Sequence, residues 1–310
     1  MVWIGIDVSK RTLDVHIEGG ERFRCKQPEE IPALVQRLSE LESPHVVMEA
    51  TGNYEWPLWE ALDEQGIRCS VVNPAHAHAF RKSLGRLAKT DAVDAELLAT
   101  MGAALRPKPT LLPSQDRRQL QVMVRRRAQI VRLQVAERNH GEHADEAMRK
   151  SIERVSQALE YELKELEQAI AAKLRQVPEL KALNEVLQTV PGVGPTVAAG
   201  VLVHLPELGQ VGKGEIAALA GLAPYNRDSG TLRGKRAIRA GRTPVRSLLY
   251  MSALVAVRHN PRLRTMYTRL LEGGKPKKLA LIAVARKLVT VLNAMARHGT
   301  PWSEMPMDAT

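Results

Sequence analysis

The order of strand and helix patterns in the first third of the chain constrains its fold more than any other feature. Three short runs typical of strands come first, and Gly19-Gly20 between the second and third predicts a hairpin turn. A helical pattern, a buried strand, a second helical pattern and a further strand then follow. The predicted strands are Val2–Asp7, Leu13–Glu18, Arg22–Lys26, His45–Met48 and Cys69–Val72, and the predicted helices are Ile31–Leu41, Trp56–Gln65, 75–84 and 91–102.

This order predicts an α/β domain of the RNase H-like (RuvC) type over residues 1–112. Residues 184–310, after a break at Pro178, predict a mostly α-helical domain. Its turn Pro191-Gly192-Val193-Gly194-Pro195 resembles the hairpin of a helix-hairpin-helix element. Gly192 and Gly194 would let backbone N–H groups approach a phosphate at a helix N-terminus, although the segment also fits a tight turn with no ligand.

Residues 113–183 predict a helical arm of two long helices. Apolar residues in the second helix recur at steps of three and four for more than three heptads, which is the seam of a coiled coil. The arm could be a helical hairpin packed on itself, or an oligomerisation arm that also touches nucleic acid through Arg125-Arg126-Arg127. The seam residues are Ile152, Val155, Leu159, Leu163, Leu166, Ile170, Leu174 and Val177.

The formal net charge of +11 is unevenly distributed along the chain. Residues 1–100 contain 11 basic and 16 acidic residues, whereas residues 221–290 contain 16 basic and 2 acidic residues. A strongly basic C-terminal part predicts a polyanionic partner, because each neutralised phosphate releases counterions. The alternative is a basic protein without a specific partner. Aromatic residues, at 4%, are too scarce for a stacking platform to be the main mode of nucleic-acid binding.

The cysteine and histidine content argues against a zinc site. Cys25 and Cys69 are too few for a disulfide framework or a cysteine zinc site, and they fit a reducing cytoplasm. His76 and His78 lack the spacing and the cysteine partners of zinc ligands. No signal peptide precedes the first strand, and no apolar run reaches the roughly 18 residues of a membrane helix. We therefore expect a cytoplasmic protein without a membrane partner.

Four acidic residues stand at positions where they could hold metal ions. Asp7 and Glu49 end predicted strands, and Asp91 and Asp94 lie one turn apart on one face of a predicted helix. Such carboxylates can converge on hard divalent cations. Two metal ions about 4 Å apart can activate a nucleophile and stabilise the leaving oxygen in phosphoryl transfer. Taken singly, each acid could equally be a turn residue or a helix cap.

Several segments resemble a known family. IGIDVSK, EATGNY and VVNPAHAHAFRKSLGRLAKTDAVDAELLA resemble the amino-terminal domain of the DEDD-type insertion-sequence transposases, the IS110 family. KTDAVDA after an Asn-Pro turn is the specific part, because IGID also opens sugar kinases and actin-like ATPases. The resemblance, which extends along essentially the whole chain, implies that Asp7, Glu49, Asp91 and Asp94 are catalytic acids. They would bind Mg²⁺, with Mn²⁺ as the alternative ion.

LAGLAPYNRDSG and VRSLLYMSAL resemble the family's carboxy-terminal domain, whose serine before glycine is the proposed nucleophile. This role carries over to Ser229, although Asp-Ser-Gly alone would be an ordinary turn. The resemblance implies a covalent serine–DNA intermediate, double-stranded donor and target DNA, and guidance by a structured (bridge) RNA. The basic residues near Ser229 predict phosphate clamps or, alternatively, a solvated face; they are Arg227, Arg233, Lys235, Arg236, Arg239 and Arg242.

A shared site would bring Ser229 of one subunit to the acids of another, in a homodimer or homotetramer formed through the coiled coil. Lys275, Lys277 and Lys278 would contact the nucleic-acid backbone nonspecifically. The rival functions are a RuvC-like structure-specific endonuclease that uses only the four acids, and a non-catalytic nucleic-acid binder. An actin-like ATPase is disfavoured because no Gly-Thr phosphate loop follows Asp7.

Overall fold

The computed structural model describes residues 1–50, 52–85, 91–142, 144–225 and 237–304, without the side chains of residues 91, 92 and 304. The chain divides into two compact units, Met1–Pro113 and Ser114–Thr310. The helices of the predicted arm and those of the predicted C-terminal domain fall within the same unit. A separate domain boundary near residue 183 remains a prediction.

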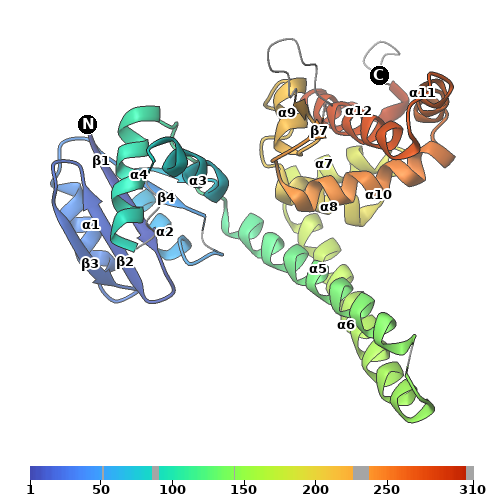
Figure 1. Ribbon diagram of the computed structural model, residues 1–310, viewed down its shortest axis with the longest axis horizontal. Coiled ribbons are helices and arrows are strands. Elements are labelled where there is room, and N and C mark those ends of the chain that lie inside the picture. The colour runs from blue at the N-terminus through green and yellow to red at the C-terminus, as the bar shows by residue number, and fades with distance from the viewer. Residues whose placement is uncertain (51, 86–90, 143, 226–236, 305–310) are drawn as a thin grey trace. The chain divides into compact units, whose positions relative to one another are not determined.

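The first unit contains a five-stranded mixed sheet in the order β3-β2-β1-β4-β5 (Figure 1). The first three strands pair antiparallel, whereas β4 and β5 run parallel to β1. The predicted α/β character of this part of the chain is confirmed, and the RNase H-like fold remains a prediction. The elements are β1 (Val2–Val8), β2 (Thr12–Ile17), β3 (Arg22–Lys26), α1 (Ile31–Ser39), β4 (Pro44–Glu49), α2 (Trp56–Glu64), β5 (Arg68–Val72), α3 (Pro74–Ser83) and α4 (Asp91–Leu105).

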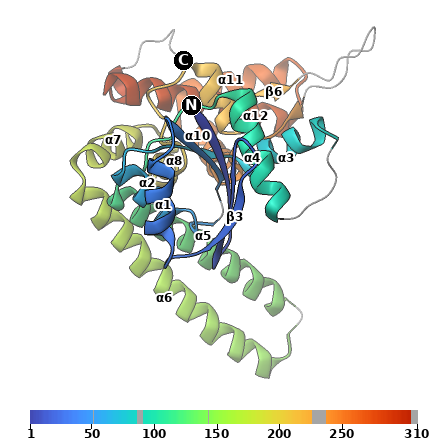
Figure 2. The ribbon, with the colours of Figure 1, turned by 90° about the vertical axis from the view of Figure 1, so that its left-hand side faces the viewer.

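Helices cover both faces of this sheet, with α1 and α2 on one side and α4 on the other (Figure 2). Successive side chains of a strand point to opposite faces, so β1 contributes to two cores. Ile4 and Ile6 pack into the core that includes residues of α1 and α2. Trp3 packs on the other face with Leu98 and Met101 of α4. The side-chain alternation of β1 therefore decides which of its residues face α4.

In its described residues, the second unit is helical apart from one two-stranded hairpin. Its largest core gathers apolar side chains from α5 to α12, and α12 contributes many of them. The predicted mostly α-helical C-terminal part is confirmed. The elements are α5 (Gln115–Gly141), α6 (Glu146–Gln176), α7 (Pro178–Gln188), α8 (Pro195–His204), α9 (Lys213–Leu219), β6 (Pro224–Tyr225), β7 (Ala237–Ile238), α10 (Thr243–His259), α11 (Pro261–Glu272), α12 (Lys277–His298) and the 3₁₀ turn η1 (Trp302–Glu304).

Among the described helices, α12 alone is long and apolar enough to cross a membrane by length and composition. Its most apolar window has a mean hydropathy of 1.7, whereas no such run was predicted from the sequence. Arg286 and Lys287 interrupt the window, and 56% of it is buried inside the protein. Burial of this extent is typical of a helix in the core of a folded protein.

α5 and α6 form a helical hairpin, which we call the arm (Figure 1). The predicted seam of α6 is well buried only at the base of the arm, where Ile170 and Leu174 are 6% and 3% exposed. Farther out, Val155 of the same seam is 43% exposed. Pairing with α5 therefore leaves apolar side chains open along the distal half of the arm, and a coiled coil remains a prediction.

Candidate active site and nucleic-acid interface

Asp7 and Glu49 lie at the ends of two neighbouring parallel strands. Ile6 of β1 pairs with Met48 of β4, so the next residues along both strands, Asp7 and Glu49, stand side by side. Neighbouring residues in register project to the same face of a sheet. Asp7 alternates with Gly5 and Trp3 along β1, and this is the face that α4 covers. The two half-buried acids therefore share the α4 side of the sheet.

A glycine lets α4 approach this face closely. A Cβ atom on Gly5 would lie 1.9 Å from the carbonyl oxygen of Ala95, so the helix backbone crosses β1 where no side chain intervenes. Asp94, the residue before Ala95, lies one turn from Leu98 on the sheet-facing side of α4 and is 9% exposed. The fold thus brings Asp7, Glu49 and Asp94 to the same layer between sheet and helix. Asp91 lies one turn earlier in α4, and its side chain is outside the described residues.

Arg81 of α3 belongs to this layer, and sequence reasoning missed it. Its Nη2 atom lies 2.5 Å from Oδ1 of Asp94, and the two side chains are only 11% and 12% exposed. The Nε atom of Arg81 is also buried, and no described group accepts a hydrogen bond from it. The feature of the sequence that could have identified Arg81 is its place one helical turn after the apolar Ala77, on the buried face of α3.

The acids offer oxygen ligands of the kind that hard divalent cations prefer. Their arrangement does not yet form a complete metal site, because no group of three His, Cys, Asp or Glu side chains in the described part of the chain could hold an ion. Asp94 is engaged by the guanidinium of Arg81 instead. The donor chemistry fits the predicted metal, and the convergence of the acids remains a prediction.

Asp14 is a second acid of this face that was not predicted. It lies directly opposite Asp7 in the antiparallel register of β1 and β2, and it is 7% exposed. Nη2 of Arg24, on β3, lies 2.8 Å from Oδ1 of Asp14. The signal was an acid between the apolar Leu13 and Val15, because strand alternation sends it to the face opposite theirs.

The serine predicted as nucleophile lies between two short paired strands of the second unit. β6 and β7 follow one another in the sequence and pair antiparallel as a hairpin, with Tyr225 opposite Ala237. Arg239 follows the hairpin and is exposed. Ser229, together with Arg227, Arg233, Lys235 and Arg236, lies outside the described residues. The role of Ser229 remains a prediction.

Arg242 anchors the chain that returns from this hairpin. Its two terminal nitrogens lie 2.6 and 2.7 Å from the carboxylate oxygens of Glu207, and Nη1 also donates to the carbonyl of His204 at 2.8 Å. Burial would raise the pKa of Glu207, but hydrogen bonds and the charge of Arg242 hold this pKa below its usual value. The sequence did not indicate this internal ion pair, and a phosphate-clamp role for Arg242 remains a prediction.

The two glycines of the helix-hairpin-helix-like turn differ in their surroundings. Gly192 has a φ of +105°, and a Cβ there would lie 2.8 Å from the Cα and Cβ of Ala256. Its carbonyl accepts a hydrogen bond from Ser252 at 2.6 Å, so Gly192 packs the turn against α10. Gly194 is the N-cap of α8 and would meet nothing with an added Cβ. Of the two glycines, Gly194 alone therefore leaves room for a ligand on the side where a Cβ atom would project.

Lys275, Lys277 and Lys278 are exposed around the start of α12. The first turn of this helix contains no acidic residue. Cations at a helix N-terminus are unfavourable because the helix dipole is positive there. A bound anion would relieve this repulsion, and the contacts of these lysines with a nucleic-acid backbone remain a prediction.

Comparisons with known proteins match both units. A family model described as transposase matches residues 4–144, and the model of the transposase IS116/IS110/IS902 family matches residues 184–268. The pilin gene-inverting proteins of Moraxella bovis and Moraxella lacunata are 28% and 29% identical to the chain, over 97% of its length and 98% of theirs. The insertion element IS110 43.6 kDa protein of Streptomyces coelicolor is 36% identical over 44% of the chain and 34% of its own length.

Proposed function

Because the chain belongs to the IS110 family of transposases, which are DNA-acting enzymes, we propose that it exchanges DNA strands at a site shared by both units. The acids of an RNase H-like first unit and Ser229 of the second unit act on one phosphodiester. The observation that carries this proposal is the common layer of Asp7, Glu49 and Asp94 beneath α4. The relatives named for gene inversion support recombination of DNA as the reaction.

The four acids Asp7, Glu49, Asp91 and Asp94 would hold divalent metal, with Mg²⁺ as the natural ion and Mn²⁺ as the alternative. When bound, such ions lower the cost of the negative charge that builds up on the phosphate oxygens. The layer between sheet and helix holds the buried Asp94 in position beside Arg81. In this proposal Arg81 orients that carboxylate before metal is bound.

Ser229 supplies the nucleophile in this proposal. Its Oγ attacks the scissile phosphorus, a phosphoserine bond forms, and the bond from phosphorus to the leaving sugar oxygen breaks. The hydroxyl proton passes to solvent, and the leaving oxygen takes up a proton. Attack by a sugar hydroxyl of another DNA strand then releases Ser229 and joins the strands. Arg227, Arg233, Lys235, Arg236 and Arg239 would bind the phosphates around this hairpin.

A second copy of the chain completes the proposed site. The open apolar side chains on the distal arm, Leu133, Val135, Val155 and Tyr161, are 43–64% exposed and offer a surface for another arm. A homodimer or homotetramer would then set Ser229 of one subunit against the acids of its neighbour. We further propose, from the family resemblance, that a structured guide RNA reads the donor and target DNA in the cytoplasm.

The test is strand cleavage by the full chain with Mg²⁺ on a DNA junction substrate, resolved on a denaturing gel. Wild-type protein is expected to give cut DNA and a slower covalent adduct. Ser229→Ala and Asp94→Asn should each lose both products, whereas Ser83→Ala, a change at another serine, should keep both. Cutting without an adduct by Ser229→Ala would instead indicate an endonuclease that uses the acids alone. Binding without cutting by wild type would indicate a non-catalytic binder.

A further inference from the structure

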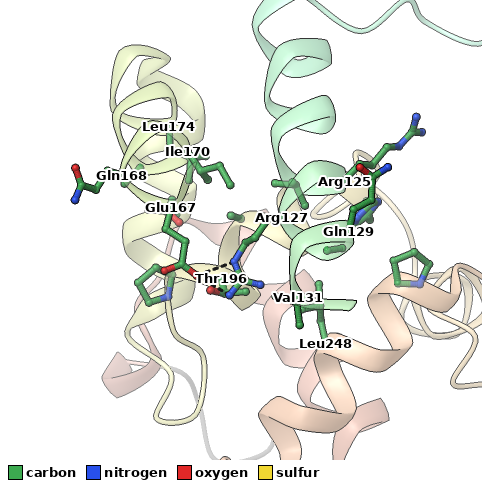
Figure 3. A pocket seen from close by; sticks show the side chains of 18 of the residues that line it. Arg125, Arg127, Gln129, Val131, Glu167, Gln168, Ile170, Leu174, Thr196 and Leu248 are labelled. Carbon is green, nitrogen blue, oxygen red and sulfur yellow. Dashed lines mark hydrogen bonds and ion pairs between the residues drawn. The ribbon is translucent and has the colours of Figure 1, made fainter. Parts of the chain in front are cut away.

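The base of the arm contains a cavity of about 1360 Å³ that the proposed strand exchange does not use. Residues of α5, α6, α7, α8 and α10 line it (Figure 3). All of them belong to the second unit. Small-molecule sites usually occupy 300–1,000 Å³, so this arm-base cavity has room for a nucleotide and its flanking phosphates.

Apolar side chains make up part of the lining of the arm-base cavity, and we call this part the floor. Val131 of α5, Leu174 of α6 and Leu248 of α10 line it, and Figure 3 shows Ile170 and Leu174 together on α6. A nucleobase stacks favourably on apolar surface because its faces are poorly hydrated. A duplex keeps its bases stacked inside, so only an unpaired base could use this floor.

The charged part of the lining, which we call the rim, is cationic on balance, although the exposed Glu185 also belongs to it. Arg125, Arg132 and Arg175 line it and are exposed. Arg127 also lines the cavity; it pairs with Glu167 at 2.6 Å and joins α5 to α6, as the dashed line in Figure 3 shows. Nearby, burial and then the charges of Arg125 and Arg242 lower the pKa of His204 to about 4, so this histidine is neutral at pH 7. The positive charge of the rim arginines attracts phosphates.

Asn184 of α7 adds a polar group that lacks a partner. Its Oδ1 atom is buried, and no described residue donates a hydrogen bond to it. Asn184 also lines the cavity. Leaving a buried amide unsatisfied costs free energy, and a ligand that pairs with it recovers that cost. An asparagine amide can both donate to and accept from the edge of a base.

We propose that the arm-base cavity binds one unpaired nucleotide of a nucleic-acid strand, with the base on the apolar floor and the flanking phosphates on the arginine rim. Asn184 contacts the edge of the base, and Arg125 and Arg175 contact the phosphates. The inference rests on the proposed function only in requiring that this chain handles nucleic acid. The strand can be DNA or RNA, since both present the same base and phosphate chemistry.

The test measures binding of short single-stranded oligonucleotides, one of DNA and one of RNA, each carrying a single 2-aminopurine. The full chain is used without divalent metal, so that no strand is cut. Binding should change the 2-aminopurine fluorescence. Asn184→Leu should weaken binding about tenfold through the lost contact to the base edge. Arg125→Gln with Arg175→Gln should also weaken it, and should flatten the slope of log affinity against log salt by about 1.4.

The matched control removes two equal charges from the distal arm. Lys150→Gln with Arg154→Gln changes exposed residues of α6 far along the chain from the cavity lining, and it should leave affinity and salt slope as in wild type. Asn184→Leu should unfold at a denaturant concentration equal to or higher than that of the wild-type protein, because an apolar side chain replaces an unsatisfied amide. The arginine pair keeps the proposal testable if Asn184→Leu does not fold.

Three results would overturn the proposal. The first is an unchanged 2-aminopurine signal on binding, and the second is equal weakening by the rim pair and the distal pair. The third is weakening of fully paired duplex binding by the rim pair to the same extent as single-strand binding, because the rim would then be a general phosphate site and not a site for an unpaired nucleotide. Ser229→Ala should bind the oligonucleotides like wild type, so failure here is separable from failure of the strand-exchange proposal.

Discussion

At the scale of single residues, the buried ion pair between Arg81 and Asp94 has the largest influence on the acid layer. Each side chain is nearly 90% buried, and Nη2 of Arg81 contacts one carboxylate oxygen. Removing one partner of such a pair leaves a charge in a poorly solvated place. The pair therefore fixes a proposed catalytic acid and couples it to the packing of α3.

Arg81→Met should lower the free energy of unfolding of the first unit by about 3 kcal/mol, because Asp94 would stay buried without its counter-charge. Arg81→Lys should recover part of this loss. Urea unfolding followed by tryptophan fluorescence in a Trp302→Phe background reports the first unit, which holds Trp3, Trp56 and Trp59. Lys82→Met, a change at the exposed neighbour, serves as the control. Equal stability of Arg81→Met and Lys82→Met would refute a structural role for the pair.

His204 gives a prediction about pH. Burial, with the charges of Arg125 and Arg242, lowers its pKa in the folded protein from 6.5 to about 4. Between these values the unfolded chain binds a proton that the folded chain does not, so stability falls as pH drops from 6.5 to 4. The loss attributable to His204 is about 3 kcal/mol, and it is absent above pH 6.5. His204→Gln should lose less stability than wild type between pH 7 and pH 4, measured by urea unfolding. Identical losses would contradict this assignment.

The positions of the acids could be predicted from the sequence, whereas their partners could not. Asp7 and Glu49 end strands that local patterns reveal, and Asp94 follows the spacing of a helix face. Arg81 and Arg24 meet their acids only because α3 packs near α4 and β3 pairs with β2. Such contacts join segments whose register and packing no local pattern encodes.

At the scale of elements, the arm shows what a heptad pattern can predict: the helix itself, but not the surface that covers its seam. The heptad spacing correctly indicates a long helix, α6, but burial along its seam decreases from Leu174 outward to Val155. The spacing cannot tell whether α5 or another subunit covers each position. Likewise, Gly192 and Gly194 look alike in sequence, yet only Gly192 is packed against α10.

The distal arm gives a prediction about assembly. Val155→Asp should shift the chain to a lower mass in sedimentation, because the new charge would be buried against a second arm. Its stability should change by no more than about 0.5 kcal/mol, since Val155 is already 43% exposed within one chain. Gln157→Asp places the same charge on an exposed polar position of α6 and should keep the wild-type mass. A monomeric wild type, or an unchanged mass for Val155→Asp, would rule out this surface.

At the scale of the whole molecule, the charge is divided between two parts with different tasks. Residues 1–100 are acidic on balance and contain three of the proposed metal ligands in the layer under α4, whereas residues 221–290 are strongly basic. In the proposed reaction neither part completes strand exchange alone, because the basic part would hold nucleic acid and the acidic part would hold cations. The central claim is that Ser229 and the acids act together on one phosphodiester.

Mass spectrometry of the covalent complex tests this claim most directly. The complex is formed with Mg²⁺, then digested with nuclease and trypsin, which releases the peptide Asp-Ser-Gly-Thr-Leu-Arg between Arg227 and Arg233. We expect a nucleotide phosphate on Ser229, and not on Thr231, in the wild-type protein, and no such adduct in Asp94→Asn. An adduct on another residue, or an adduct on Ser229 that forms equally well in Asp94→Asn, would contradict the shared site.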